Sequence, residues 1–202
     1  MIKEACVESF SEALDAEKRG ATRIELCENL EVGGTTPSYG TMAMCKEKLS
    51  VPFFPMIRPR GGDFVYSEDE LEIMKKDIQL CKELKVDGIV FGILTKEGKV
   101  NMEQSKELVE LARPMPVTFH KAFDDTPDPD QALEDIIACG AARILTSGTK
   151  DTAKEGTDIL NRIIEKAKGR IIIVAAGKVT KENVDLLSEQ INTSEFHGKR
   201  IV

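Results

Sequence analysis

Residues 53–94 read FFPMIRPRGGDFVYSEDELEIMKKDIQLCKELKVDGIVFGIL, and this stretch decides the fold. Two short apolar runs, 53–58 and 88–94, flank a longer amphipathic segment at 68–84. The apolar side chains of that segment follow helical spacing: Leu71, Met74, Ile78, Cys81 and Leu84. Ser67 opens the segment and Glu70 follows three residues later, which is a capping-box pattern. A strand, a helix and a second strand in this order predict a parallel βαβ unit.

The same alternation fills the whole chain of 202 residues. Strands are expected near residues 2–7, 23–27, 53–58, 88–94, 116–122, 143–147, 171–176 and 195–197. Helices are expected near residues 9–19, 39–49, 68–84, 103–112, 130–139, 153–167 and 180–190. This pattern predicts one α/β domain, residues 1–202, folded as a (β/α) barrel of the TIM type with eight parallel strands. Because the sequence stops soon after the last strand, the eighth helix is expected to be short or missing. The alternative is a doubly wound open sheet, but no glycine-rich dinucleotide fingerprint supports it.

Composition narrows the classes of function. The net charge of -7 argues against a nucleic-acid-binding surface. Neither a signal peptide nor a membrane-spanning segment is apparent, so a cytoplasmic protein without a membrane partner is expected. Five cysteines without a CxxC pair indicate reduced thiols, with neither a disulfide framework nor a structural zinc site. No organic cofactor is expected.

Strand alternation predicts which side chains point into the barrel. Apolar residues should face the helices, which sends the alternate residues inward. The resulting interior is polar and includes both histidines of the chain: Glu4, Cys6, Glu25, Cys27, Arg58, His120, Glu195 and His197. Burying so many ionisable groups is costly unless they pair with one another or serve a site. Two readings remain: a structural ion-pair network, or a functional site at the C-terminal mouth of the barrel.

Two cysteines and two loop segments at this mouth could bind ligands. Cys6 and Cys27 lie on neighbouring strands that are ~4.8 Å apart, so two thiolates would suit a soft ion such as Cu(I), while two inert buried thiols are the alternative. Thr146-Ser147-Gly148 and Ala176-Gly177-Lys178 follow the sixth and seventh strands and offer donors to anions, although such turns are also ordinary strand–helix connections.

Six segments together resemble the copper homeostasis protein CutC family. They are RIELC (23–27), GGTTPSYG (33–40), IRPRGGDF (57–64), TFHKAFD (118–124), LTSG (145–148) and EFHG (195–198). The resemblance implies a barrel, a cytosolic location, homo-oligomers and a role in copper handling. It also implies that Cys6 and Cys27 match cysteines proposed to bind Cu(I) in some members. Glu25, Arg58, His120 and Asp124 match the polar cluster of the family at the barrel mouth. Ala175-Ala176-Gly177-Lys178 replaces a more glycine-rich turn, which counts against a phosphate role for that loop.

Two functions follow. The first is a copper-binding protein that uses Cys6 and Cys27, supplemented by His120 or Met56. The second is an enzyme acting on a small anionic metabolite, a carboxylate or a phosphate. In that enzyme Glu25, His120 and Asp124 would be catalytic, and four residues would bind the substrate: Arg58, Arg60, Ser147 and His197. Lys121 is expected to point toward the helices, so no Schiff-base lysine is predicted.

Two questions stay open at this point. Arg58 would pair either with Glu25 or with a ligand, and Arg60 would either reach into the mouth or stay solvated.

A missing eighth helix would also uncover Phe196, Ile201, Ala5 and Val7 on the outer faces of the eighth and first strands. A partner subunit or the C-terminal tail is expected to cover them, which favours a homodimer.

Overall fold

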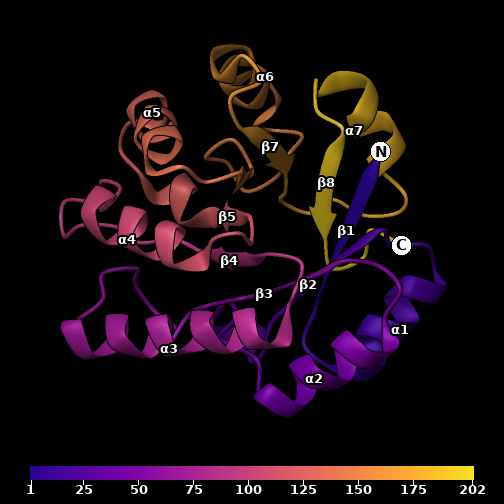
Figure 1. The fold of residues 1–202 in the computed structure, drawn as a ribbon. Helices are drawn as coiled ribbons and strands as arrows, with labels where there is room; N and C mark the ends of the chain where they lie inside the picture. The colour runs from indigo at the N-terminus through magenta and orange to yellow at the C-terminus, as the bar shows by residue number, and fades with distance from the viewer.

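A computed structural model describes residues 1–202 and has eight parallel strands alternating with seven α-helices (Figure 1). The strands are β1 (Ile2–Val7), β2 (Arg23–Leu26), β3 (Phe53–Pro55), β4 (Ile89–Phe91), β5 (Val117–Phe119), β6 (Arg143–Thr146), β7 (Ile172–Ala175) and β8 (Glu195–Gly198). The helices are α1 (Phe10–Lys18), α2 (Tyr39–Lys48), α3 (Glu68–Leu84), α4 (Met102–Ala112), α5 (Pro129–Cys139), α6 (Thr157–Ala167) and α7 (Val184–Gln190). Short 3₁₀ helices follow β2 (η1, Leu30–Val32) and β5 (η2, Lys121–Asp125). The predicted (β/α) barrel of eight parallel strands is confirmed.

The sheet runs in the order β3-β2-β1-β8-β7-β6-β5-β4 and almost closes on itself. The two end strands meet just beyond β3, where Met56 and Val90 form a single parallel bridge. There the Ile57 N–H donates to the Val90 carbonyl oxygen at 2.7 Å. The barrel is therefore nearly closed, and side chains at alternate strand positions share one interior.

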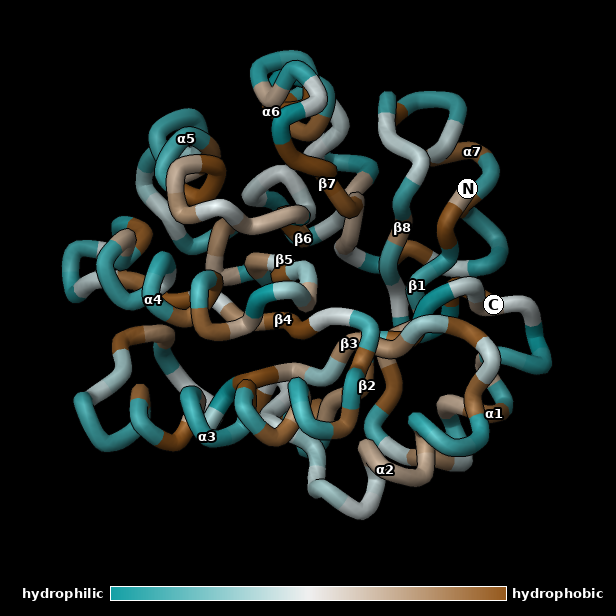
Figure 2. Tube along the Cα trace, in the orientation of Figure 1, coloured by the Kyte–Doolittle hydropathy of each residue, from teal (hydrophilic) through white to brown (hydrophobic).

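Local sequence rules account for the helix ends. Ser67 and Glu70 form the predicted capping box at the start of α3. Asp128 caps α5, Pro129 occupies its first turn, and Gly140 ends it in the left-handed conformation. The apolar faces of the helices pack on the strands in one core of 48 buried residues, and in Figure 2 the outward turns of α3 and α5 are largely hydrophilic. This core lies outside the barrel wall, separate from the polar interior.

The main differences from the expected boundaries lie at the mouth of the barrel. β3, β4 and β5 each end three residues earlier than expected, and α6 and α7 each begin four residues later. After β3, the Arg58 carbonyl oxygen accepts from the Thr36 N–H at 2.9 Å, so this segment bonds to a loop instead of a neighbouring strand. The strand ends therefore give way to loops that shape the mouth.

The residues after β8 bond to the loop that follows β7. Thr180 and Arg200 form a parallel bridge, and the Lys181 N–H donates to the Arg200 carbonyl oxygen at 2.8 Å. Phe196 and Ile201 are 0% exposed within the single chain. Ala5 and Val7 are also buried. The chain thus covers this face by itself, so the face gives no argument for a homodimer.

None of the helices combines the length and the apolar character needed to cross a membrane.

Candidate functional site

The floor of the barrel is a network of four charged side chains, three of them buried and one, Arg143, partly buried. The guanidinium of Arg23 donates to the carboxylates of both Glu4 and Glu195. Arg143 donates to the same Glu195 oxygen at 3.2 Å. Both guanidiniums lie over the ring of Phe54, at 5.2 and 5.3 Å from its centroid. The ion pairs and the aromatic ring fill the end of the barrel opposite the mouth.

The inward position of Arg23 and Arg143 was missed by sequence reasoning. The signal is present in both strands, since Arg23 is two residues before the inward Glu25 and Arg143 is two residues before Leu145. Each is the first residue of its strand, and the alternation rule extends to it. Their presence means that Glu4 and Glu195 are neutralised without any help from Arg58.

His197 lies between two carboxylates above this floor. Its Nδ1 is 2.8 Å from Glu4 Oε1, and its Nε2 is 3.7 Å from Glu25 Oε2. Burial alone would lower the pKa of His197, but the Glu25 charge and hydrogen bonds with Cys6 and Glu4 raise it well above its usual value. Burial likewise would raise the pKa of Glu4, but His197 and Arg23 lower it to about 2. The raised pKa favours an imidazolium that pairs with Glu4. Glu4, Glu25 and His197 also each place one potential ligand atom within 4.8 Å of the others.

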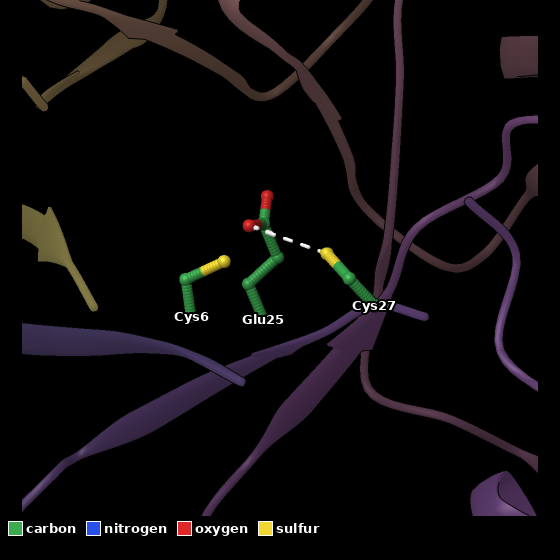
Figure 3. Close-up of side chains that lie close together, drawn as sticks. All are labelled: Cys6, Glu25 and Cys27. Carbon is green, nitrogen blue, oxygen red and sulfur yellow. Dashed lines mark hydrogen bonds between the residues drawn. The ribbon is translucent and has the colours of Figure 1, made fainter. Parts of the chain in front are cut away.

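Cys6, Glu25 and Cys27 form a compact group beside His197 (Figure 3). One ligand atom from each of the three lies within 4.8 Å of the others. Cys6 pairs with Glu25 across the β1–β2 ladder, and Cys27 follows two residues after Glu25, so the carboxylate stands between the thiols. The Cys27 thiol donates to Glu25 Oε2 at 3.7 Å. The sequence predicted that Cys6 and Cys27 point inward from neighbouring strands, and both cysteines lie in this group.

Both thiols are protonated in this setting. A hydrogen bond with Cys27, burial and the Glu25 charge raise the pKa of Cys6 well above its usual value. The hydrogen bond with Cys6 lowers the pKa of Cys27, but burial and the Glu25 charge outweigh it and raise that pKa. Burial also raises the pKa of Glu25 itself, although the His197 charge opposes this. A metal ion bound here must therefore displace protons from sulfur.

A cavity of about 260 Å³ opens above these groups at the C-terminal ends of the strands. We call it the mouth cavity. Its lining includes the predicted residues Cys6, Glu25, Cys27, Arg58, His120 and His197. The apolar wall includes Met56, which packs with the two cysteines, and Phe64. Six of the nine predicted site residues thus surround one space.

Arg58 is held by loop carbonyl oxygens and not by Glu25. Its guanidinium donates to Val32 at 3.1 Å, to Gly34 at 3.1 Å and to Gly62 at 2.6 Å. The guanidinium carbon also lies 4.7 Å from the centroid of the Phe64 ring. Its Nε is buried without a hydrogen-bond partner. Arg58 therefore keeps a positive charge at the mouth that no carboxylate neutralises.

His120 is a neutral imidazole in a fixed tautomer. Its Nδ1 accepts from the Ala122 N–H at 3.2 Å, which leaves the ring proton on Nε2. Burial and the positive charge of Arg58 lower the pKa of His120 to about 3. The Nε2 atom is buried and has no partner. At neutral pH this side chain is therefore a hydrogen-bond donor, and it is poorly suited to take up a proton.

Asp124 and Ser147 lie outside the lining of the mouth cavity and bind each other. Asp124 accepts from the Ser147 N–H at 3.0 Å and from the Thr149 N–H at 2.9 Å, and it also accepts from the Thr146 hydroxyl. Ser147 Oγ contacts Asp124 Oδ2 at 3.0 Å and donates to the Lys150 carbonyl oxygen. These contacts fasten η2 to the loop after β6.

Lys121 was expected to point toward the helices, and this was wrong. Its ammonium group donates to Asp124 and Ser147, and the residue lines the mouth cavity. β5 ends at Phe119 and η2 begins at Lys121, so strand alternation no longer sets the direction of its side chain. The mouth therefore carries one more cation than alternation predicted.

Arg60 turns away from the mouth. It donates to Glu70 and to Asp63, and its guanidinium lies 5.4 Å from the centroid of the Tyr66 ring. It is absent from the lining of the mouth cavity. These contacts tie the loop after β3 to the first turn of α3.

Comparisons with known proteins agree along the whole chain. A protein-family model described as the CutC family matches residues 1–202. The human copper homeostasis protein cutC homolog is 47% identical over 196 residues, which cover 97% of this chain and 72% of that protein. A family protein CutC from Chromobacterium violaceum is 44% identical over 197 residues, covering 98% of this chain and 80% of that protein.

Solved structures support the same fold. A crystal structure described as CutC from Streptococcus agalactiae has a TM-score of 0.95 at 36% identity and covers 100% of both chains. The aldolase QR15 has a TM-score of 0.71 at 17% identity and covers 98% of this chain and 89% of that one. At this low identity the aldolase shows a shared barrel and nothing about chemistry.

Proposed function

The chain belongs to the CutC family of copper homeostasis proteins, and from this premise we propose that it binds one Cu(I) ion between Cys6 and Cys27. The observation that carries the proposal is the approach of the two sulfurs and one Glu25 oxygen to within 4.8 Å of one another. Thiolates are the ligands that Cu(I) prefers, and linear two-sulfur coordination needs no other donor. Copper would be the cargo of the protein and not a resident cofactor.

The surroundings of the two thiols suit a soft ion. Cys6 and Cys27 pack in one buried cluster with Met56, Phe54 and Val90. The Met56 thioether is therefore the better candidate for a third ligand. His120 is the poorer one, because its Nδ1 already accepts a hydrogen bond and its Nε2 carries the proton. A group of two thiols and a thioether favours Cu(I) over harder ions.

Titration with Cu(I) under anaerobic conditions tests this proposal. Wild-type protein is expected to bind about one equivalent in competition with a Cu(I)-selective chelator. The double variant Cys6→Ala, Cys27→Ala should lose this binding. The double variant Cys45→Ala, Cys81→Ala is the matched control, since it removes two buried thiols that lie outside the mouth cavity. Equal affinity in wild type and in the Cys6, Cys27 variant would overturn the proposal.

A second candidate function is an enzyme acting on a small anionic metabolite at the mouth cavity. Three of the eight buried side-chain atoms that lack a hydrogen-bond partner belong to residues lining this one cavity, namely Glu25 Oε1, Arg58 Nε and His120 Nε2. Burying such atoms is unfavourable unless a ligand or a water molecule makes the missing hydrogen bond. Arg58 and neutral His120 would donate to a carboxylate or carbonyl oxygen. Glu25, whose pKa is raised, is the better group to accept a proton.

A thermal-shift screen of small carboxylates and phosphates tests the second candidate. Compounds that stabilise wild type should lose most of their effect in His120→Asn, which keeps an acceptor for the Ala122 N–H but removes the Nε2–H donor. Lys96→Gln, at an exposed residue outside the cavity lining, serves as the control. If every stabilising compound raises the stability of wild type and of His120→Asn equally, these compounds do not bind in the mouth cavity.

Family membership also supports the proposal of a cytoplasmic homo-oligomer, with a dimer favoured. The predicted uncovered face no longer supports it, because the tail covers that face within one chain. Light scattering at micromolar concentration measures the mass directly. A monomer under those conditions would contradict the proposal.

A further inference from the structure

A second cavity of about 420 Å³ adjoins the mouth cavity. We call it the loop cavity. Its walls come mainly from the segments 176–180 and 198–200, which follow β7 and β8. The two cavities share four lining residues, Cys6, Lys121, His197 and Lys199. A ligand in one cavity is therefore next to the other.

The loop cavity is lined by cations without acids. Lys178, Lys199 and Arg200 join Lys121 in its lining, and no Asp or Glu is among the lining residues. Lys178, Lys199 and Arg200 make no ion pair, in contrast to Lys121, which pairs with Asp124. The chain as a whole carries a net charge of -7, so this concentration of positive charge opposes the average of the surface. Three uncompensated cations around one hollow favour a multiply charged anion.

The backbone that carries these cations is held in place. A side chain at Gly177 would meet Ser147 Cβ at 2.7 Å, and one at Gly198 would meet the Val179 carbonyl oxygen at 2.0 Å. The two loops therefore pack against their neighbours too closely to admit a side chain at either glycine. The Thr180–Arg200 bridge joins the loop after β7 to the tail after β8. The hollow is thus formed before any ligand arrives, which reduces the entropic cost of binding.

We propose that the loop cavity binds the phosphate group of a small phosphorylated metabolite whose other end enters the mouth cavity. The second part of this statement rests on the second candidate function. A phosphate monoester carries about two negative charges near pH 7, which match the three unpaired cations better than a single carboxylate does. The turn after β7 is less rich in glycine than the family resemblance implies. This difference does not remove the site, because the positive charge comes from side chains. The deep end of the ligand would supply the oxygen that the buried Nε2–H of His120 and Nε–H of Arg58 lack.

Inorganic phosphate is the probe for the loop cavity, with calorimetry at fixed ionic strength as the measurement. The variant Lys178→Gln, Arg200→Gln changes two residues that line the loop cavity and not the mouth cavity. Its phosphate dissociation constant should rise about tenfold or more relative to wild type. Lys181→Gln is the nearby control, because it removes one positive charge from an exposed residue of the same loop that is outside the lining. That control should bind phosphate as wild type does.

A pair of compounds separates this proposal from the second candidate function. Dihydroxyacetone phosphate should bind more tightly than dihydroxyacetone in wild type, and the difference should vanish in the Lys178, Arg200 variant. His120→Asn should weaken both compounds if the mouth cavity takes the carbonyl end, but it should leave inorganic phosphate unaffected. Phosphate binding without any effect of His120→Asn would therefore remove the second candidate and keep the phosphate site. No saturable binding of phosphate by wild type, or equal binding by wild type and the double variant, would overturn the phosphate site.

Discussion

Cys6 lies directly opposite Glu25 across the β1–β2 ladder, and this pairing puts a carboxylate between the two thiols of the candidate copper site. A carboxylate beside a thiol disfavours the thiolate, and it contributes to raising the pKa of both Cys6 and Cys27. The neighbouring imidazolium of His197 offsets this charge, since it lies 3.7 Å from the same carboxylate. Copper binding at this place must therefore be coupled to proton release.

The affinity for Cu(I) is accordingly expected to depend steeply on pH. Both thiols are protonated at neutral pH because their pKa values are raised, so one bound ion displaces about two protons. Each unit of decrease in pH should then lower the apparent affinity roughly 100-fold. Chelator competition at several pH values, corrected for the protonation of the chelator, measures the slope. An affinity that does not change with pH would exclude two protonated cysteine ligands.

The two histidines should show opposite protonation states in one spectrum. The chain has only these two, so ¹⁵N-histidine labelling gives one set of ring signals for each. His197 is expected as an imidazolium at pH 7 because its pKa is raised, and His120 as the neutral Nε2–H tautomer because its pKa is lowered to about 3. The variant His120→Asn assigns the signals. Two neutral rings at pH 7 would contradict an ion pair between His197 and Glu4.

Sequence reasoning reached the fold and the inward residues by one rule. Alternation of apolar runs specified eight strands and seven helices, and alternation within strands placed Glu4, Glu25 and His197 inside the barrel. This works because a ladder with one face on the helices leaves each side chain only two directions. The rule applies while the ladder continues, so its accuracy ends where the strands end.

The errors and open questions lie where the ladders stop. Lys121 follows the end of β5, and η2 turns its side chain to the mouth. Arg58 follows the end of β3, and carbonyl oxygens of two loops bind it in place of Glu25. Asp124 pairs with a loop after β6 that is distant in sequence. Contacts among loops depend on the closed barrel as a whole, and no local pattern encodes them.

Stability is expected to fall in acid because of His120. Its folded pKa of about 3 lies below the usual histidine value of 6.5, so the unfolded chain binds more protons between these values. The stabilising contribution is therefore present above pH 6.5 and is lost as pH falls toward 3, by up to about 5 kcal/mol. Urea unfolding at pH 7, 6 and 5 measures this loss. His120→Asn should show a shallower dependence on pH, and an equal dependence in both proteins would contradict a buried neutral imidazole.

The floor network predicts a large difference between two arginines. Arg23→Met leaves Glu4 and Glu195 without their main cation and should lower the free energy of unfolding by about 3–5 kcal/mol. Arg170→Met removes an equally well-formed pair with Glu134, but both side chains are about half exposed, so the loss should be much smaller. Chemical denaturation of both variants at pH 7 makes the comparison. Similar losses in the two variants would show that burial does not decide the strength of the floor network.

The residues after β8 should stabilise the barrel. Ile201 is 0% exposed and belongs to the same core as Phe196, Ala5 and Val7, so Ile201→Ala should lower the free energy of unfolding by about 2–5 kcal/mol. Leu186→Ala is the control, because Leu186 on α7 is 52% exposed and its removal should cost less than about 1 kcal/mol. If the tail covers the barrel in each chain, the effect of Ile201→Ala should not depend on protein concentration. A loss that shrinks as the concentration rises would mean instead that a second subunit covers this face, which would restore the argument for a dimer.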